Sequence, residues 1–275
     1  MTRRTAWLKG ALLTGFLVMT AFGGAAVAAD AVEPGCVPAV SAVNGKVEGA
    51  GGYADSENEK GDLAWEAGGS LSLPLGCLLG FQADIGASNK LDDTQYGAIG
   101  HLFIRDPQTY LFGVTGGGVD GDDTKLYAVG PEAEVYLGNL TLEAWGGYLN
   151  IDQDDGGGKD SGFIIGDVAY YPTDDLRLSV GGKLVDDQQG LRAGFEYQIG
   201  GMPMSVYSKA DYGDDDFFSI LGGLRFYFGG EDKSLIRRHR EDDPRNRTFD
   251  LITQGERDRN RGNGQPAGGG TAPPP

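Results

Sequence analysis

The chain has 275 residues, of which 48 are glycine, and its formal net charge at neutral pH is −17. Residues 1–28 carry three positive charges and no negative one, so their removal leaves a charge of −20. Such acidity excludes nucleic acid as a favoured partner, because phosphate binding needs clustered Lys and Arg. The glycine content lies far above the roughly 7% of ordinary proteins. The glycines stand within alternating aromatic and aliphatic runs, which argues against low-complexity disorder.

The first 28 residues are typical of a secretory signal peptide. A positively charged start precedes an apolar run over residues 11–21 and the small-x-small cleavage sequence Ala26-Val27-Ala28. The positive charges are Arg3, Arg4 and Lys9. The apolar run is too short for a convincing membrane-spanning helix. We therefore predict an exported protein in which residues 29–43 form an N-terminal periplasmic arm.

Alternation of apolar and polar residues predicts twelve β-strands between residues 44 and 228. The expected ranges are 44–54, 62–74, 77–87, 94–105, 109–118, 123–137, 140–151, 161–171, 175–184, 190–200, 203–212 and 217–228. Most lengths match the ~9–11 residues with which a tilted strand crosses a bilayer. The expected fold class is all-β: a closed antiparallel transmembrane barrel over residues 44–229, with a mostly disordered periplasmic tail over 230–275. Ten or fourteen strands also fit the pattern.

Two kinds of connection alternate along the chain. Short turns such as Gly138-Asn139 alternate with charged, Asp-rich loops such as residues 152–160. Outer-membrane barrels of bacteria have short periplasmic turns and longer outer loops, so we expect extracellular acidic loops and periplasmic termini. A soluble periplasmic sandwich is the alternative, and aromatic residues near strand ends disfavour it because they suit the two interfacial girdles. The expected girdle residues are Tyr53, Tyr110, Tyr148, Tyr171, Tyr197, Phe217 and Phe228.

The final strand contains Gly223-x-x-Phe226-x-Phe228, a glycine followed by two alternate aromatic residues. With the signal peptide and the alternating strands, this makes residues 44–228 resemble the porin-like superfamily of small outer-membrane β-barrels from Gram-negative bacteria. The resemblance implies that Gly223, Phe226 and Phe228 form the signal read by the barrel-assembly machinery. It also implies contact with outer-membrane lipid and lipopolysaccharide.

The chain departs from the family pattern in two ways. Leu221 stands where the family prefers a polar residue, and a tail of more than forty residues follows the last strand. The sequence carries no interface signature, so the oligomeric state stays open.

The charged strand positions are expected to point inward, because an Arg or Lys facing lipid at mid-depth costs about 2–4 kcal/mol. Acids dominate the first two-thirds of the barrel and bases the last third. The expected acidic wall comprises Glu48, Glu66, Asp84, Glu132, Glu134, Glu143 and Asp167. The expected basic wall comprises Arg105, Arg177, Lys183, Arg192, Lys209 and Arg225.

Two functions fit such a lumen. The first is a narrow porin-like channel for passive diffusion of small polar or charged solutes, across which opposed walls set a transverse field. The second is a closed structural or adhesion-type barrel in which the same charges pair across a filled lumen. Twelve strands lie between filled eight-stranded and open sixteen-stranded barrels, so strand number does not decide. A role in assembly or envelope tethering through the tail is a third hypothesis.

The sequence offers no catalytic constellation, and we predict no enzyme activity and no cofactor. Beyond the signal peptide the histidines are His101, expected inside the barrel beside an acid, and His239 in the tail. Gly156–Lys159 fails as a phosphate loop because Asp160 replaces the required Ser or Thr. The Asp clusters lack EF-hand spacing, so we predict no specific metal site, and loose binding of Ca²⁺ by the loops stays open.

Cys36 and Cys77 are candidates for a disulfide that pins the N-terminal arm, since the periplasm is oxidising. In the tail, Leu235 and Ile236 are expected to start a short helix that Pro244 stops. Residues 255–275 are polar and then Gly/Pro-rich, and are expected to hang free. A contact of three arginines with the acidic lumen stays open; they are Arg237, Arg238 and Arg240.

Overall fold

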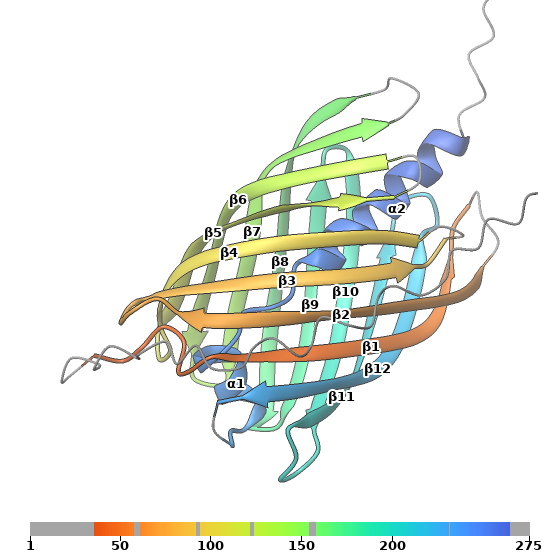
Figure 1. The fold of residues 1–275 in the computed structure, drawn as a ribbon. Coiled ribbons are helices and arrows are strands. Elements are labelled where there is room, and N and C mark those ends of the chain that lie inside the picture. The colour runs from red at the N-terminus through yellow and green to blue at the C-terminus, as the bar shows by residue number, and fades with distance from the viewer. Residues whose placement is uncertain are drawn as a thin grey trace, which may run out of the picture. The chain divides into compact units, whose positions relative to one another are not determined.

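The computed structural model describes residues 36–57, 61–91, 94–121, 124–153, 158–230 and 232–264, with side chains up to Asp258. Twelve strands form a closed barrel in which neighbours in sequence pair antiparallel and β1 closes on β12 (Figure 1). The strands are β1 (Asn44–Asp55), β2 (Asp62–Pro74), β3 (Leu79–Asn89), β4 (Thr94–Asp106), β5 (Tyr110–Asp120), β6 (Thr124–Leu137), β7 (Leu140–Gln153), β8 (Lys159–Thr173), β9 (Leu176–Val185), β10 (Gln188–Gln198), β11 (Met204–Gly213) and β12 (Phe218–Gly229). The predicted fold class is confirmed, and no predicted strand end is displaced by more than two residues. The predicted signal peptide lies outside the described residues.

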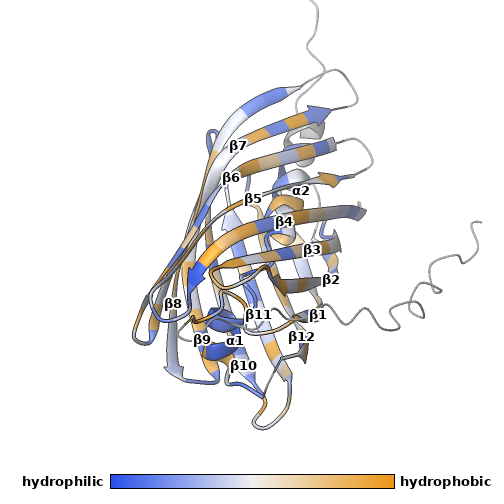
Figure 2. Cartoon of the chain, turned by 60° about the vertical axis from the view of Figure 1, so that its left-hand side comes forward, coloured by the Kyte–Doolittle hydropathy of each residue, from blue (hydrophilic) through white to orange (hydrophobic). Residues whose placement is uncertain are grey.

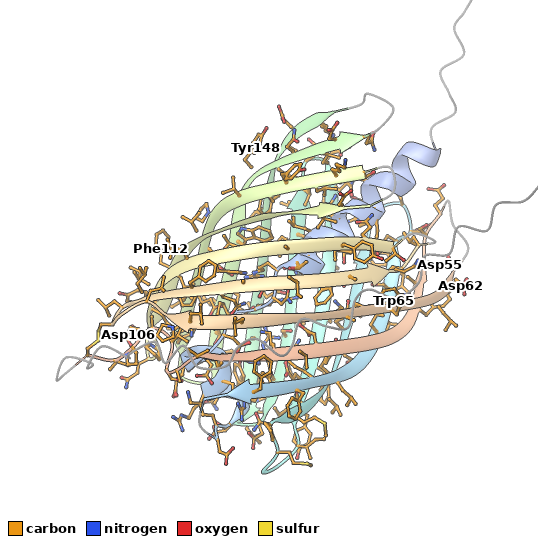
Figure 3. The ribbon with its side chains drawn as sticks, viewed as in Figure 1. Asp55, Asp62, Trp65, Asp106, Phe112 and Tyr148 are labelled. Atoms are coloured by element: carbon orange, nitrogen blue, oxygen red, sulfur yellow. A yellow bond between two sulfur atoms is a disulfide. The ribbon has the colours of Figure 1, made fainter. Side chains whose placement is uncertain are left out.

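The strands carry alternate residues to the two faces of the barrel, which Figure 2 shows as alternating colours along several strands. The outer face is apolar: Trp65, Phe112 and Tyr148 are exposed and point away from the barrel (Figure 3). Most predicted girdle residues are exposed, as expected for a lipid-facing surface. Tyr171 and Phe217 are the exceptions, because both side chains are buried. Their predicted girdle role is wrong, since Tyr171 points inward from β8 and Phe217 is buried just before β12.

The barrel has two different rims. The turn rim is the end that carries the five short connections, such as Gly138-Asn139, and the loop rim is the end that carries the six Asp-rich connections. In Figure 3, Asp106 marks the turn rim, and Asp55 and Asp62 mark the loop rim. Among the described residues, no helix is long and apolar enough to cross a membrane.

The N-terminal arm is fixed at the turn rim. Cys36 and Cys77 form the predicted disulfide, with their Cα atoms 6.0 Å apart. The backbone amide of Ala39 then donates to the carbonyl of Cys77 over 2.7 Å. Ala39 and Val40 are fully buried in an apolar cluster on the inner wall, which also contains Phe103, Leu111 and Tyr136. The arm therefore covers part of this end of the lumen.

The tail after β12 turns back into the barrel. Helix α1 (Leu235–Glu241) lies at the turn rim, and helix α2 (Thr248–Gly264) lies in the lumen and reaches the loop rim (Figure 1). The short helix before Pro244 is confirmed. Residues 255–264 are helical, whereas the sequence predicted free chain there, and residues 265–275 lie outside the described residues. The part of the tail in α2 lies inside the barrel, where the sequence did not predict it.

Candidate functional site: the lumen and the tail inside it

The inner face of the barrel carries every predicted wall residue. The side chains of Arg177, Lys209 and Arg225 are partly exposed to the remaining lumen space, and the other predicted wall residues are buried. The acids lie on β1–β3 and β6–β8, and the bases lie on β9–β12 except for Arg105, which lies on β4. The structure thus divides the lumen wall into an acidic and a basic sector.

The basic sector is paired with acids of nearby strands. The Arg177 Nη2 atom lies 2.7 Å from Glu143 Oε1, and Arg192 Nε lies 3.2 Å from Asp167 Oδ1. Arg225 is shared between Glu48, at 2.5 Å, and Glu196. Lys209 pairs with Glu66 on β2, further round the wall. The two sectors therefore neutralise each other in large part.

His101 is the centre of a fully buried polar cluster on β3–β6. Its Nδ1 lies 2.7 Å from Glu132 Oε2 and its Nε2 lies 2.9 Å from Asp84 Oδ2. Thr115 donates its hydroxyl to the same Glu132 oxygen over 2.7 Å. The expected pairing of His101 with a lumen acid is confirmed. Both ring nitrogens have acidic partners, so neither is left free for proton transfer to a substrate.

Arg247 of the tail joins the same cluster. Its backbone amide donates to Asp84 Oδ2 over 3.1 Å, and its Nε donates to Glu132 Oε1 over 3.0 Å. Its Nη1 also donates to Asp250, one turn into α2, over 3.3 Å. The guanidinium is fully buried. An arginine from the tail thus supplies a positively charged partner of Glu132.

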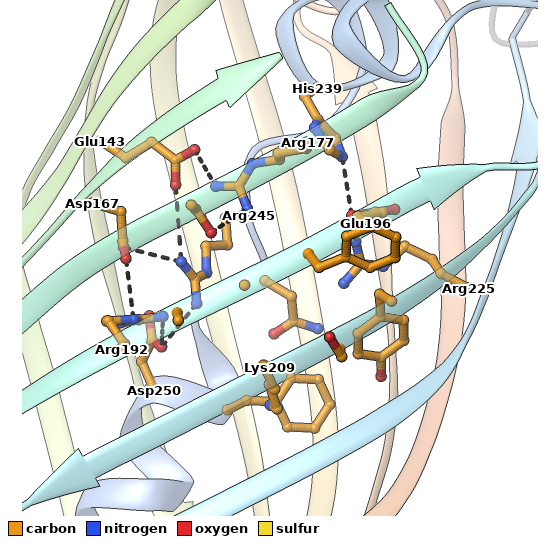
Figure 4. Close-up of a pocket in the computed structure, with 18 of the residues that line it drawn as sticks. Glu143, Asp167, Arg177, Arg192, Glu196, Lys209, Arg225, His239, Arg245 and Asp250 are labelled. Carbon is orange, nitrogen blue, oxygen red and sulfur yellow. Dashed lines mark hydrogen bonds and ion pairs between the residues drawn. The ribbon is translucent and has the colours of Figure 1, made fainter. Parts of the chain in front are cut away.

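The extended residues 243–247, which connect α1 with α2, are bound along their whole length. Arg245 lies between Asp167, at 3.0 Å, and Asp250, at 3.7 Å, as Figure 4 shows. The carbonyl of Pro244 accepts hydrogen bonds of 3.1 Å from Gln82 and from Lys46, and Lys46 also pairs with Asp243. We call these residues and the wall groups that they touch the charged lumen region.

Helix α2 packs on a second, apolar lumen region nearer the loop rim. Phe249, Leu251 and Ile252 of α2 are buried there in one cluster with inward residues of β4–β9. The wall members are Ile99, Val119, Leu126, Ala128, Trp145, Leu149, Ile151, Phe163, Ile165 and Val185. Each large apolar side chain buried in this way contributes roughly 1.5–3 kcal/mol relative to exposure.

A row of three glycines in the wall allows the start of α2 to pack closely against it. Gly68, Gly86 and Gly97 are in register across β2, β3 and β4. A Cβ atom at Gly86 would lie 3.1 Å from Phe249 and 3.2 Å from Thr248. A Cβ atom at Gly97 would lie 2.7 Å from the Thr248 methyl group. The wall is therefore shaped to receive this helix.

Helix α1 closes the turn rim with polar contacts. Its His239 lies 2.8 Å from the Tyr171 hydroxyl and 3.3 Å from the Tyr227 hydroxyl. Burial lowers the pKa of His239 to about 4, so its imidazole is neutral at pH 7.

The three arginines of the tail for which the sequence left a lumen contact open have different partners in the structure. Arg238 donates to Gln198 over 3.1 Å, and Arg240 donates to the carbonyl of Leu140 over 2.9 Å. Both meet neutral groups of the wall at these contacts, whereas Arg237 pairs with Glu241 of its own helix.

A cavity of about 110 Å³ lies in the lumen between the tail and the basic sector. It is lined at the turn rim by Tyr136 and Tyr171, and further inside by Arg192, Lys209 and Asp211. Figure 4 shows this lining, with the ion pairs of Arg192 and Arg245 on one side of the space. The cavity is much smaller than the lumen of an open porin and has room for a few water molecules.

Comparison with known proteins supports the architecture. No protein-family model and no curated protein matches the chain. The KdgM porin matches with a TM-score of 0.50 and 7% sequence identity over 67% of this chain and 99% of the porin, both alone and in complex with disordered oligogalacturonate. The NanC porin matches with a TM-score of 0.48 and 14% identity over 66% of this chain and 98% of its own. Omp33 of Acinetobacter baumannii has a TM-score of 0.42 and 13% identity over 68% of this chain and 99% of its own.

The chain has the fold of a porin-like outer-membrane β-barrel. At these sequence identities the likeness concerns the fold and leaves the transported substance open.

Sequence reasoning missed the apolar lumen region of this porin-like barrel. A signal was present, because Leu126-Tyr127-Ala128-Val129 and Phe163-Ile164-Ile165 are apolar on both strand faces. A strand with two apolar faces needs an apolar partner inside the barrel as well as lipid outside. Phe249, Leu251 and Ile252 are the matching apolar group of the tail.

Proposed function

We propose that the protein is a narrow outer-membrane channel for small polar or charged solutes, and that the described structure is its restricted state. The observation that carries this proposal is the charged lining of the cavity, to which β6–β12 contribute. The lining runs from Tyr136 near the turn rim to Lys183 near the loop rim. A wet, charged path of this kind selects small polar solutes. The proposal includes no enzymatic step, because His101 has acidic partners on both ring nitrogens.

A closed structural barrel is the second candidate, and the apolar lumen region favours it. Release of α2 would expose Phe249, Leu251 and Ile252 together with their wall partners to water. The free energy of this exposure opposes spontaneous opening. Under the channel proposal, solutes therefore pass beside the docked tail, or the charged lumen region opens while α2 stays in place.

The last strand supports a proposed interaction with the barrel-assembly machinery. Phe226 and Phe228 are exposed on the outer face. Gly223 has no room for a side chain, since a Cβ atom would lie 2.2 Å from the carbonyl oxygen of Gly49 on β1. Leu221, the departure from the family pattern, is buried inside the barrel beside Ala54, Ala64, Leu91 and Phe217. Because position 221 packs in an apolar cluster inside the barrel, leucine suits this position, and the proposed interaction does not depend on a polar residue there.

The test is single-channel conductance in a planar bilayer, with mature protein and with a chain that ends at Gly230. We expect a small steady conductance from the mature protein and a larger one from the shortened chain. The reversal potential in a KCl gradient then shows which wall dominates selectivity. If both proteins keep the circular dichroism of a barrel and neither conducts, the channel proposal fails and the closed barrel replaces it.

A further inference from the structure

The tail makes contacts at both rims of the barrel. At the turn rim, the Ile236 amide donates to the carbonyl of Asp174 over 2.9 Å. Halfway along the lumen, Arg247 is held by Asp84 and Glu132. These contacts follow one another in chain order, so the tail runs through the lumen in one direction.

At the loop rim, three consecutive residues of α2 contact the wall. Glu256 accepts a hydrogen bond of 3.2 Å from Ser88 and lies 3.6 Å from Lys90, at the end of β3. Arg257 donates to the carbonyl of Gln189 over 3.1 Å, and Asp258 accepts from Gln188 over 2.5 Å. Gln188 and Gln189 begin β10 at the loop rim.

The length of the segment agrees with a full crossing. Residues 243–247 can span at most roughly 16 Å, at about 3.3 Å per residue. Thr248 to Asp258 adds roughly 16 Å of helix at 1.5 Å per residue. The total is about the thickness of the hydrocarbon core, roughly 30 Å.

The charge of the following chain also suits the loop rim. Residues 259–275 contain two arginines and no acidic residue. The connections at this rim are rich in aspartate, for example Asp186-Asp187 and Asp214-Asp215-Asp216. The connections at this rim therefore carry a charge opposite to that of residues 259–275.

We propose that this barrel passes its own C-terminal segment through the lumen and presents the chain after Asp258 on the side of the acidic loops. The segment is thus a displayed peptide as well as a lumen filler, and it leaves the barrel beside the end of β3 and the start of β10. In the expected orientation this side is the cell surface. The inference is independent of conduction, since it concerns the path of the chain alone.

Cysteine labelling tests this path directly. Cys36 and Cys77 are joined, so a single added cysteine provides the reactive thiol. Three variants are compared in a Gram-negative host: Ala267→Cys as the reporter, Gly158→Cys as the loop-rim reference and Asn139→Cys as the turn-rim reference. Intact cells receive a maleimide that cannot cross the outer membrane, and permeabilised cells show the total reactive thiol.

We expect Ala267→Cys to react together with Gly158→Cys in intact cells, and Asn139→Cys to react only after permeabilisation. If Ala267→Cys and Gly158→Cys are both protected while Asn139→Cys reacts, the chain is threaded as proposed and the expected orientation is wrong. Reaction of Ala267→Cys on the same side as Asn139→Cys overturns the proposal. Gel mobility without heating confirms that each variant forms a folded barrel before it is scored.

Discussion

The charged and the apolar lumen regions hold the same tail by different means. Arg245 and Arg247 are held by ion pairs and hydrogen bonds, whereas Phe249 and Ile252 are held by packing. A buried ion pair returns little net stability because both partners lose their hydration, but it penalises any shift of one partner. Burial of apolar side chains stabilises the docked tail by an amount that depends on the buried area and little on the direction of each contact. The difference indicates that α2 supplies most of the holding free energy and that residues 243–247 set the position of the tail.

The largest expected effect comes from a charge in the apolar region. Ile252→Asp places an unpaired carboxylate at a fully buried apolar position, and we expect the docking of α2 to weaken by roughly 4–5 kcal/mol. Hydrogen exchange of the α2 amides measures the free energy of opening. Ile252→Val is the matched control, with an expected loss of about 1 kcal/mol. Equal exchange in both variants would show that packing does not hold the helix.

The second-largest effect on tail docking is expected from loss of an ion pair in the charged lumen region. Arg247→Met leaves Glu132 without its tail partner, and we expect a loss of roughly 3 kcal/mol in the free energy of tail docking. Conductance should rise while α2 keeps more exchange protection than in Ile252→Asp. Arg237→Met is the control, because Arg237 is exposed at the turn rim and pairs with Glu241 of its own helix. If Arg247→Met reduced the exchange protection of α2 as much as Ile252→Asp does, α2 packing would not supply most of the free energy that holds the tail.

A smaller effect is expected from the glycine row. Gly86→Val puts methyl groups where Phe249 and Thr248 now lie, and overpacking of this kind costs about 1–3 kcal/mol. Hydrogen exchange should show faster opening at the start of α2 than at its end. In the chain that ends at Gly230 the same substitution has no tail to meet, so the thermal stability of that barrel should not change. If Gly86→Val lowered the stability of the full chain and of the shortened chain by similar amounts, the valine would clash with the barrel wall and not with α2.

The smallest effect is expected at the loop rim, outside both lumen regions. The hydrogen bond from Lys159 lowers the pKa of Asp186, so its contribution is present at neutral pH and disappears as the pH falls through the lowered value. Both side chains are exposed, and solvent screens the pair. Asp186→Asn should therefore lower the melting temperature slightly at pH 7, and the difference from the unchanged protein should shrink as the pH is lowered below the ordinary range of an aspartate. A difference that does not shrink with falling pH would exclude this ion pair as its cause.

The strands were predictable because each one carries its own signal. An alternating strand such as β10 shows its two faces in eleven residues, and turn residues mark both ends. The inward position of Glu132 or Arg192 follows from the same alternation. The tail was not predictable in this way, because its local composition favours disorder. Its order comes from Asp84, Glu132 and the apolar wall, which lie more than sixty residues away in the sequence.

The pairing of β1 with β12 has a consequence for biogenesis. This seam, which joins Asn44 to Gly229 at one end and Asp55 to Phe218 at the other, completes the ring of strands around a segment that the ribosome makes after all twelve strands. A ring completed before the tail arrives would hold Trp145 and Leu149 against water until α2 is inserted from the turn rim. A ring completed around the tail would never expose them. Because exposed apolar surface is the more costly course, membrane insertion and tail capture are best regarded as one concerted event.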